Sequence, residues 1–64
     1  MNIASKIRAY RTNLSMSQEM LAQRAKIPYA TLVKIEGGKV LNPTIKTLVK
    51  IAKALNIKID DLIE

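Results

Sequence analysis

The ionisable side chains of this 64-residue sequence are mostly cationic, with eleven Lys and Arg residues against five Asp and Glu residues. The sequence contains neither histidine nor cysteine, which excludes disulfides, thiolate metal sites and imidazole acid–base catalysis. The carboxylates available to an oxygen-ligand metal site are few: Glu19, Glu36, Asp60, Asp61 and Glu64. We therefore expect no enzyme, no metal and no cofactor, and no small-molecule site is evident.

The charge is unevenly distributed along the chain. All eleven cationic residues precede Ile59, whereas only two of the five acidic residues do. A basic body with a small acidic end suits a polyanionic partner that meets one face of the protein. A charge excess that serves only solubility is the alternative, and composition alone does not separate the two.

Hydropathy argues against membrane insertion or secretion. No stretch approaches the roughly 18 uninterrupted apolar residues of a transmembrane helix. The first ten residues, MNIASKIRAY, lack the apolar core of a signal peptide, so we expect a cytoplasmic location. The stretch TIKTLVKIAKALNIKI is basic and amphipathic like a membrane-surface peptide. Its apolar residues are needed for a protein core, which disfavours that alternative.

Apolar residues recur with the helical period of 3.6 and predict an all-α fold of five short helices. Ser17 caps the second helix, Pro28 separates it from the third, and the pair Gly37-Gly38, able to adopt positive φ, ends the third. The fourth helix opens at Asn42-Pro43-Thr44, with Asn42 or Thr44 as its cap, and Asn56 is its expected left-handed stop. The first three predicted helices span residues 3–13, 18–25 or 26, and 29–36. The fourth opens within residues 42–44, and the fifth spans about 59–63. Short connections leave room for one domain over residues 1–64.

Residues 18–37, QEMLAQRAKIPYATLVKIEG, form the most specific pattern. Ala22 supplies a small side chain where two helices can cross steeply, and a short tight turn separates them. The positions that must be apolar in such a unit are occupied by Leu21, Ala25, Ile27, Leu32 and Ile35. The fourth helix is expected to bury a stripe made of Ile45, Leu48, Ile51, Ala52 and Leu55. The pattern predicts a helix-turn-helix unit.

The segment MSQEMLAQRAKIPYATLVKIEGGK resembles the lambda-repressor-like (Cro and repressor type, Xre-like) helix-turn-helix family. It follows the family pattern Leu-Ser-Gln-x-x-Leu-Ala, with Met16 for the first leucine, then an alanine-containing turn and Thr-Ile/Leu-x-x-Ile-Glu-x-Gly-Lys. The run NPTIKTLVKIAKALNIKIDDLI resembles the family's last two helices. Three positions depart from the pattern: Lys26 replaces a left-handed glycine, Met20 the capping-box glutamate, and Pro28 the cap of the third helix.

The resemblance implies a small sequence-specific regulator of transcription, a repressor, whose third helix enters the major groove of double-stranded DNA. Because Leu32 and Ile35 point inward, the outward residues expected to read bases are Tyr29, Ala30, Val33 and Lys34. Lys34 can donate to guanine, and Ala30 and Val33 can contact thymine methyls. A merely solvated surface is the alternative. An antitoxin or adaptor that binds proteins is the alternative function of the same fold.

The resemblance also implies phosphate contacts and a structural ion pair. The residues expected to contact phosphates are Ser17, Gln18, Lys39, Asn42 and Lys46. The family pairs the glutamate at position 36 with the arginine at position 11. We therefore expect a partly buried Arg11–Glu36 ion pair that fixes the first helix against the third.

Domains of this family bind as two-fold dimers to half-sites about 34–36 Å apart, so the resemblance implies a weak homodimer on a two-fold symmetric operator. Val40 and Leu41 form an apolar pair that we expect to be exposed in the loop before the fourth helix. The full set of residues expected at the dimer contact is Val40, Leu41, Ile57, Ile59 and Ile63. The alternative is that some of them close the core.

Overall fold

A computed structural model describes residues 2–40 and 42–63, so the predicted contact at Leu41 lies outside the described residues. The helices are α1 (Ile3–Asn13), α2 (Gln18–Ala25), α3 (Tyr29–Glu36), α4 (Ile45–Ala54) and α5 (Asp60–Ile63). The described residues contain no strand. The five-helix all-α prediction is confirmed, and the bounds of α1 and α3 agree to the residue. The fifth helix begins one residue later than expected.

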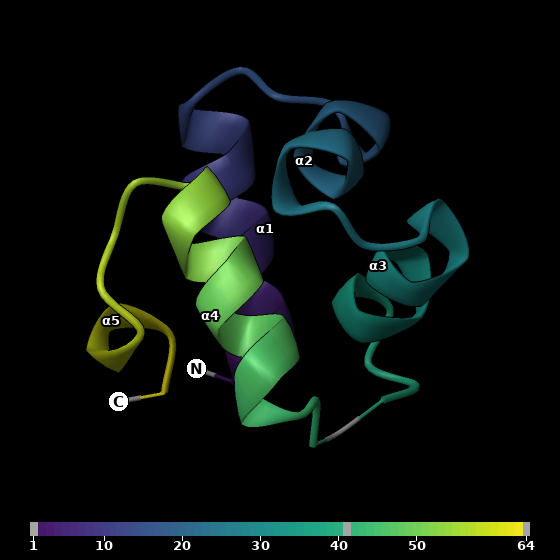
Figure 1. Ribbon diagram of the computed structural model, residues 1–64, viewed down its shortest axis with the longest axis vertical. Coiled ribbons are helices and arrows are strands. Elements are labelled where there is room, and N and C mark those ends of the chain that lie inside the picture. The colour runs from purple at the N-terminus through teal and green to yellow at the C-terminus, as the bar shows by residue number, and fades with distance from the viewer. Residues whose placement is uncertain (1, 41, 64) are drawn as a thin grey trace.

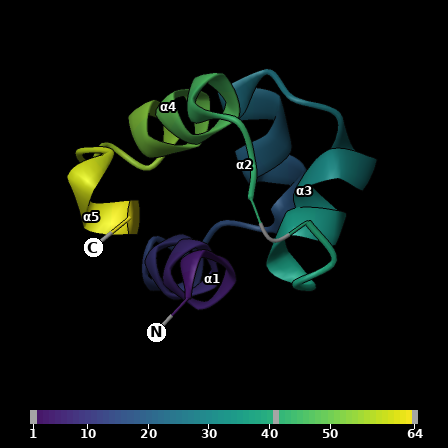
Figure 2. The same cartoon turned by 90° about the horizontal axis from the view of Figure 1, so that it is seen from below.

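The five helices surround one apolar core (Figure 1). Seen from below, α1 and α4 lie on opposite sides of that core, with α3 at one edge and α5 at the other (Figure 2). α2 contacts α3 and α4, whereas α1 contacts α3 and α5, so α3 is held by two helices. The buried apolar side chains are Ile7, Met16, Leu21, Ala22, Ala25, Leu32, Ile35, Leu48, Ile51, Ala52, Leu55 and Leu62.

Side chains cap the N-termini of two helices as the sequence predicted. Ser17 Oγ accepts a hydrogen bond of 3.0 Å from the backbone N–H of the third residue of α2. Thr44 Oγ1 accepts the equivalent hydrogen bond in α4 at 3.2 Å, which decides between Thr44 and Asn42 in favour of Thr44. α3 begins after Pro28 without a side-chain cap. The start of α3 therefore depends on the proline and on tertiary packing.

Non-glycine residues with a left-handed φ follow three helices: Ser15 (φ 57°) after α1, Lys26 after α2 and Asn56 after α4. Lys26 has φ 57° and ψ 45° after α2, the conformation that the family resemblance assigns to a glycine, and Asn56 has φ 58° after α4. In the glycine pair only Gly38 uses a positive φ, of 78°. Gly37 keeps a helical φ of −80°, and a Cβ there would lie 3.1 Å from the carbonyl oxygen of Val33. The expectation of positive φ thus holds for one glycine of the pair.

Two expectations about apolar residues are wrong. Ile45 is 64% exposed and does not belong to the buried stripe, because it is the first residue of α4 and the helix end projects beyond the core. Val40 is half-buried against the core and not exposed, and Ile57 and Ile59 also pack against the core. A chain this short recruits apolar loop residues to cover its core. Of the described residues expected at a dimer contact, only Ile63 is largely exposed, at 49%.

Candidate nucleic-acid interface

The outer side of α3 exposes the four residues that the sequence predicted for base reading. Tyr29 is 51% exposed and Val33 is 37% exposed, and Ala30 and Lys34 are exposed as well. The inner side holds the helix in place, since Leu32 and Ile35 are buried. α3 therefore presents a short face of small, aromatic and basic side chains on a helix fixed by its apolar side.

The residues predicted to contact phosphates come from three segments next to α3. Ser17 and Gln18 lie at the start of α2, Lys39 follows α3, and Asn42 and Lys46 lie in the loop before α4 and in its first turn. All are exposed except Gln18, which is half-buried. The backbone N–H of Lys39 donates to the carbonyl oxygen of Lys34 at 3.0 Å, which folds this loop back onto the end of α3.

The predicted ion pair between Arg11 and Glu36 is confirmed. Arg11 Nε donates to Glu36 Oε2 at 2.8 Å and Nη2 donates to Oε1 at 3.0 Å, the two-pronged geometry of strong guanidinium–carboxylate pairs. The side chains are 13% and 3% exposed, respectively. Arg11 Nη1 also donates to the carbonyl oxygen of Met16 at 2.8 Å. The guanidinium thus joins α1 to α3 and to the loop before α2.

Gln18 makes a contact that sequence reasoning missed. Its Nε2 donates to Glu36 Oε1 at 3.2 Å, so the carboxylate accepts hydrogen bonds from two side chains. The amide group has a second N–H and a carbonyl oxygen that this bond does not use. No sequence pattern signals the contact, because it depends on how α2 and α3 cross. The residue predicted to bind phosphate is therefore held in place by a buried carboxylate.

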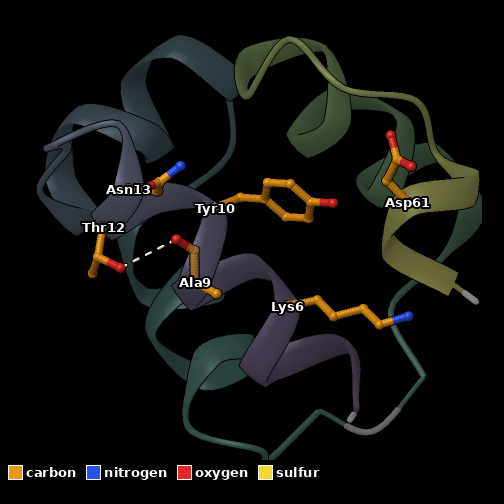
Figure 3. Close-up of a pocket in the computed structure, with 6 residues that line it drawn as sticks. All are labelled: Lys6, Ala9, Tyr10, Thr12, Asn13 and Asp61. Atoms are coloured by element: carbon orange, nitrogen blue, oxygen red, sulfur yellow. Dashed lines mark hydrogen bonds between the residues drawn. The ribbon is translucent and has the colours of Figure 1, made fainter.

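A depression of about 660 Å³ between α1 and α5 also escaped the sequence analysis. Figure 3 shows Tyr10 and Lys6 projecting from α1 toward the side of α5 on which Asp61 lies. The remaining lining residues are Ala9, Thr12 and Asn13. α5 and α3 lie at opposite edges of the molecule, so this depression is separate from the outer face of α3 (Figure 1).

Within residues 2–40 and 42–63, no three His, Cys, Asp or Glu side chains gather closely enough to hold a metal ion. No helix in that part of the chain combines the length and apolar character that crossing a membrane requires.

Comparison with known proteins agrees with this geometry. A family model described as helix-turn-helix matches residues 7–62. An uncharacterized HTH-type transcriptional regulator of Archaeoglobus fulgidus is 40% identical over 58 residues, which cover 91% of this chain and 80% of that protein. A similarly named regulator of Methanocaldococcus jannaschii is 36% identical over 58 residues, covering 91% of this chain and 86% of that protein. The chain therefore belongs to the helix-turn-helix family of the Cro and repressor type, a family of DNA-binding transcriptional regulators and not of enzymes.

Proposed function

We propose that this protein binds duplex DNA sequence-specifically as a transcriptional repressor, with α3 in the major groove. The observation that carries the proposal is the exposed outer face of α3, whose inner side is anchored by Leu32 and Ile35. A major groove about 12 Å wide admits an α-helix, and residues early in the second helix of this motif reach base edges. Occupying the groove excludes other proteins from the same base pairs, so repression needs no further activity.

The chemistry of the outer face suggests how bases are distinguished. Lys34 donates to guanine O6 or N7, and the methyl groups of Ala30 and Val33 contact thymine methyls. Val33 is partly exposed in the free protein and gains burial in such a contact. Tyr29 packs on a thymine or donates its hydroxyl to a phosphate.

Phosphate contacts on both sides of α3 set its register in the groove. On one side Ser17 and Gln18 stand at the start of α2, where backbone N–H groups and the helix dipole favour an anion. On the other side Lys39, Asn42 and Lys46 contact the backbone. Such contacts position the protein but carry no sequence information. Because Glu36 already holds the Gln18 amide, less side-chain entropy is lost when Gln18 binds.

The operator is a two-fold symmetric site bound by a weak homodimer. One α3 covers few base pairs, so specificity requires two copies on half-sites about 34–36 Å apart. The exposed Ile63 and the uncovered edges of Val40, Ile57 and Ile59 provide the apolar contact. Because this apolar surface is small, the two copies associate only weakly in solution. Simultaneous binding to adjacent half-sites on DNA stabilises the dimer.

Selection of bound sites from a pool of random duplexes tests the proposal. The expected result is enrichment of a two-fold symmetric sequence with half-sites one helical turn apart, bound more weakly as the salt concentration rises. Enrichment of a single asymmetric site would contradict binding as a dimer and would still support sequence-specific base reading. A pool that stays random after repeated rounds would overturn sequence-specific binding.

A further inference from the structure

The outer side of α4 carries three lysines. Lys46, Lys50 and Lys53 are four and three residues apart, which places them on one side of the helix, opposite the buried Leu48 and Ile51. At a rise of about 1.5 Å per residue, they span roughly 10 Å. Lys46 and Lys53 are exposed and Lys50 is partly covered. We name these three residues the α4 basic face.

Nothing within the described fold neutralises the α4 basic face. The helix sequence IKTLVKIAKA has no acidic residue, and the one ion pair found in residues 2–40 and 42–63 joins Arg11 to Glu36. Like charges three or four residues apart on a helix repel each other. Folding therefore retains a repulsion that a polyanion bound along α4 would relieve.

The α4 basic face lies on a different side of the molecule from the proposed groove-reading surface. α4 lies on the side of the core opposite α1, whereas α3 lies at one edge of the core (Figure 2). The apolar side of α4 faces the core, so its lysines face outward from the α4 side of the molecule. Lys46 lies in the first turn of α4, whereas Lys50 and Lys53 lie about one and two helical turns further along.

We infer that Lys50 and Lys53 of the α4 basic face bind the phosphate backbone of a second DNA duplex, while Lys46 contacts the first, so that one protein holds two duplexes together. This goes beyond the proposed function and depends on it only for the first duplex. A protein partner fits less well, because protein interfaces are enriched in aromatic residues, Met and Arg and depleted in Lys. Lys50 and Lys53 lie about 4.5 Å apart along the helix axis, and a duplex carries one charge per roughly 1.7 Å, so the two lysines meet more than one phosphate. The contact is sequence-independent.

A bridging assay tests the inference. One duplex is immobilised, the full chain is bound to it at low salt, and capture of a fluorescent second duplex of unrelated sequence is measured. The wild-type protein captures the second duplex, and capture decreases as salt increases. The variant Lys50→Gln/Lys53→Gln loses capture by about tenfold, whereas its affinity for a single duplex changes less than about threefold. The matched control Lys6→Gln/Arg8→Gln removes two cations from α1, across the core from α4, and retains capture.

The results that would contradict the inference can be distinguished from those that would contradict the proposed function. If the wild type binds no duplex at all, both the proposed function and this inference are wrong. If single-duplex binding is normal but the second duplex is not captured, only the inference is wrong. Capture that survives in Lys50→Gln/Lys53→Gln assigns bridging to a homodimer with two α3 helices and also overturns it. Poly-glutamate serves as a probe for an acidic protein partner. If Lys50→Gln/Lys53→Gln loses binding to poly-glutamate but captures the second duplex as the wild type does, the α4 basic face binds an acidic protein and the inference is wrong.

Thermal melting supplies a readout independent of DNA. Because Lys50→Gln/Lys53→Gln removes the repulsion within α4, the variant melts at or above the wild-type temperature. A clearly lower melting temperature would contradict the uncompensated charge on which the inference rests.

Discussion

Gln18 donates a hydrogen bond of 3.2 Å from Nε2 to Oε1 of Glu36, a carboxylate that is almost fully buried. The same carboxylate accepts two hydrogen bonds from Arg11, which also binds the carbonyl oxygen of Met16. One network therefore joins the end of α1, the start of α2 and the end of α3. The groups that hold α3 in place also hold the glutamine that we assign to phosphate, so stability and DNA affinity are coupled at Glu36.

Replacing one member of the ion pair is expected to destabilise the fold strongly. Glu36→Ala leaves Arg11 charged and mostly buried without its partner, a loss of about 3–5 kcal/mol in the free energy of unfolding. Arg11→Ala has a similar effect. Urea unfolding followed by circular dichroism measures the change. Because a domain of this size has only a few kcal/mol of stability, the comparison is made in a stabilising osmolyte.

Arg24→Ala is the matched control for this prediction, since Arg24 is exposed on α2 and its removal is expected to change stability by less than about 0.5 kcal/mol. The double variant Arg11→Met/Glu36→Leu removes both charges and is expected to lose less than the two single losses combined. A loss below about 1 kcal/mol in both alanine variants would mean that the pair behaves like an exposed one.

Gln18→Ala is expected to weaken binding to all DNA sequences alike without changing its salt dependence. Gln18 is neutral, so its phosphate contact releases no counterion. Lys39→Ala, by contrast, is expected to lower the slope of log affinity against log salt by about 0.9. Fluorescence anisotropy titrations at four salt concentrations separate the two. An unchanged affinity in Gln18→Ala would show that the amide serves Glu36 alone.

Lys34→Ala is expected to change which sequences are bound. Lys34 is exposed on the outer face of α3, where a lysine donor recognises guanine, and losing one such contact removes about 1–3 kcal/mol of discrimination. Lys39→Ala is expected to lower affinity evenly across sequences. Competition binding against a panel of single-base operator variants measures both. Identical specificity profiles for the two variants would contradict the division between base-reading and phosphate-binding residues.

Much of the fold could be predicted because its determinants are local. Ser17 and Pro28 fix helix boundaries through their own backbone and side-chain chemistry, and both boundaries agree with the structure. Burial at the ends of elements could not be predicted in the same way. Periodicity assigns Ile45 to the buried stripe, but its exposure depends on where the neighbouring helices stop. Val40 shows the converse, because the fold of its loop places an apolar side chain against the core.

In the candidate site, too, features set by local sequence could be predicted, and features set by tertiary packing could not. The exposure of Tyr29 and Val33 follows from helical periodicity once Leu32 is placed inside. The Arg11–Glu36 pair was available only through the family resemblance, since the two residues are 25 positions apart. The bond from Gln18 to Glu36 was predicted by neither route, because it is set by the crossing of α2 and α3.

Lys26→Gly is expected to stabilise the protein. Lys26 adopts the left-handed conformation, with φ 57°, which strains a residue with a Cβ by about 1–2 kcal/mol. Glycine removes this strain but loses more backbone entropy on folding, so the net gain expected is about 0.5–1 kcal/mol. For a domain of this size that gain corresponds to a rise of a few degrees in Tm. The control Gln23→Gly places glycine at an exposed helical position of α2 and is expected to cost about 1 kcal/mol. If both glycine variants lower the Tm equally, the left-handed conformation of Lys26 carries no strain.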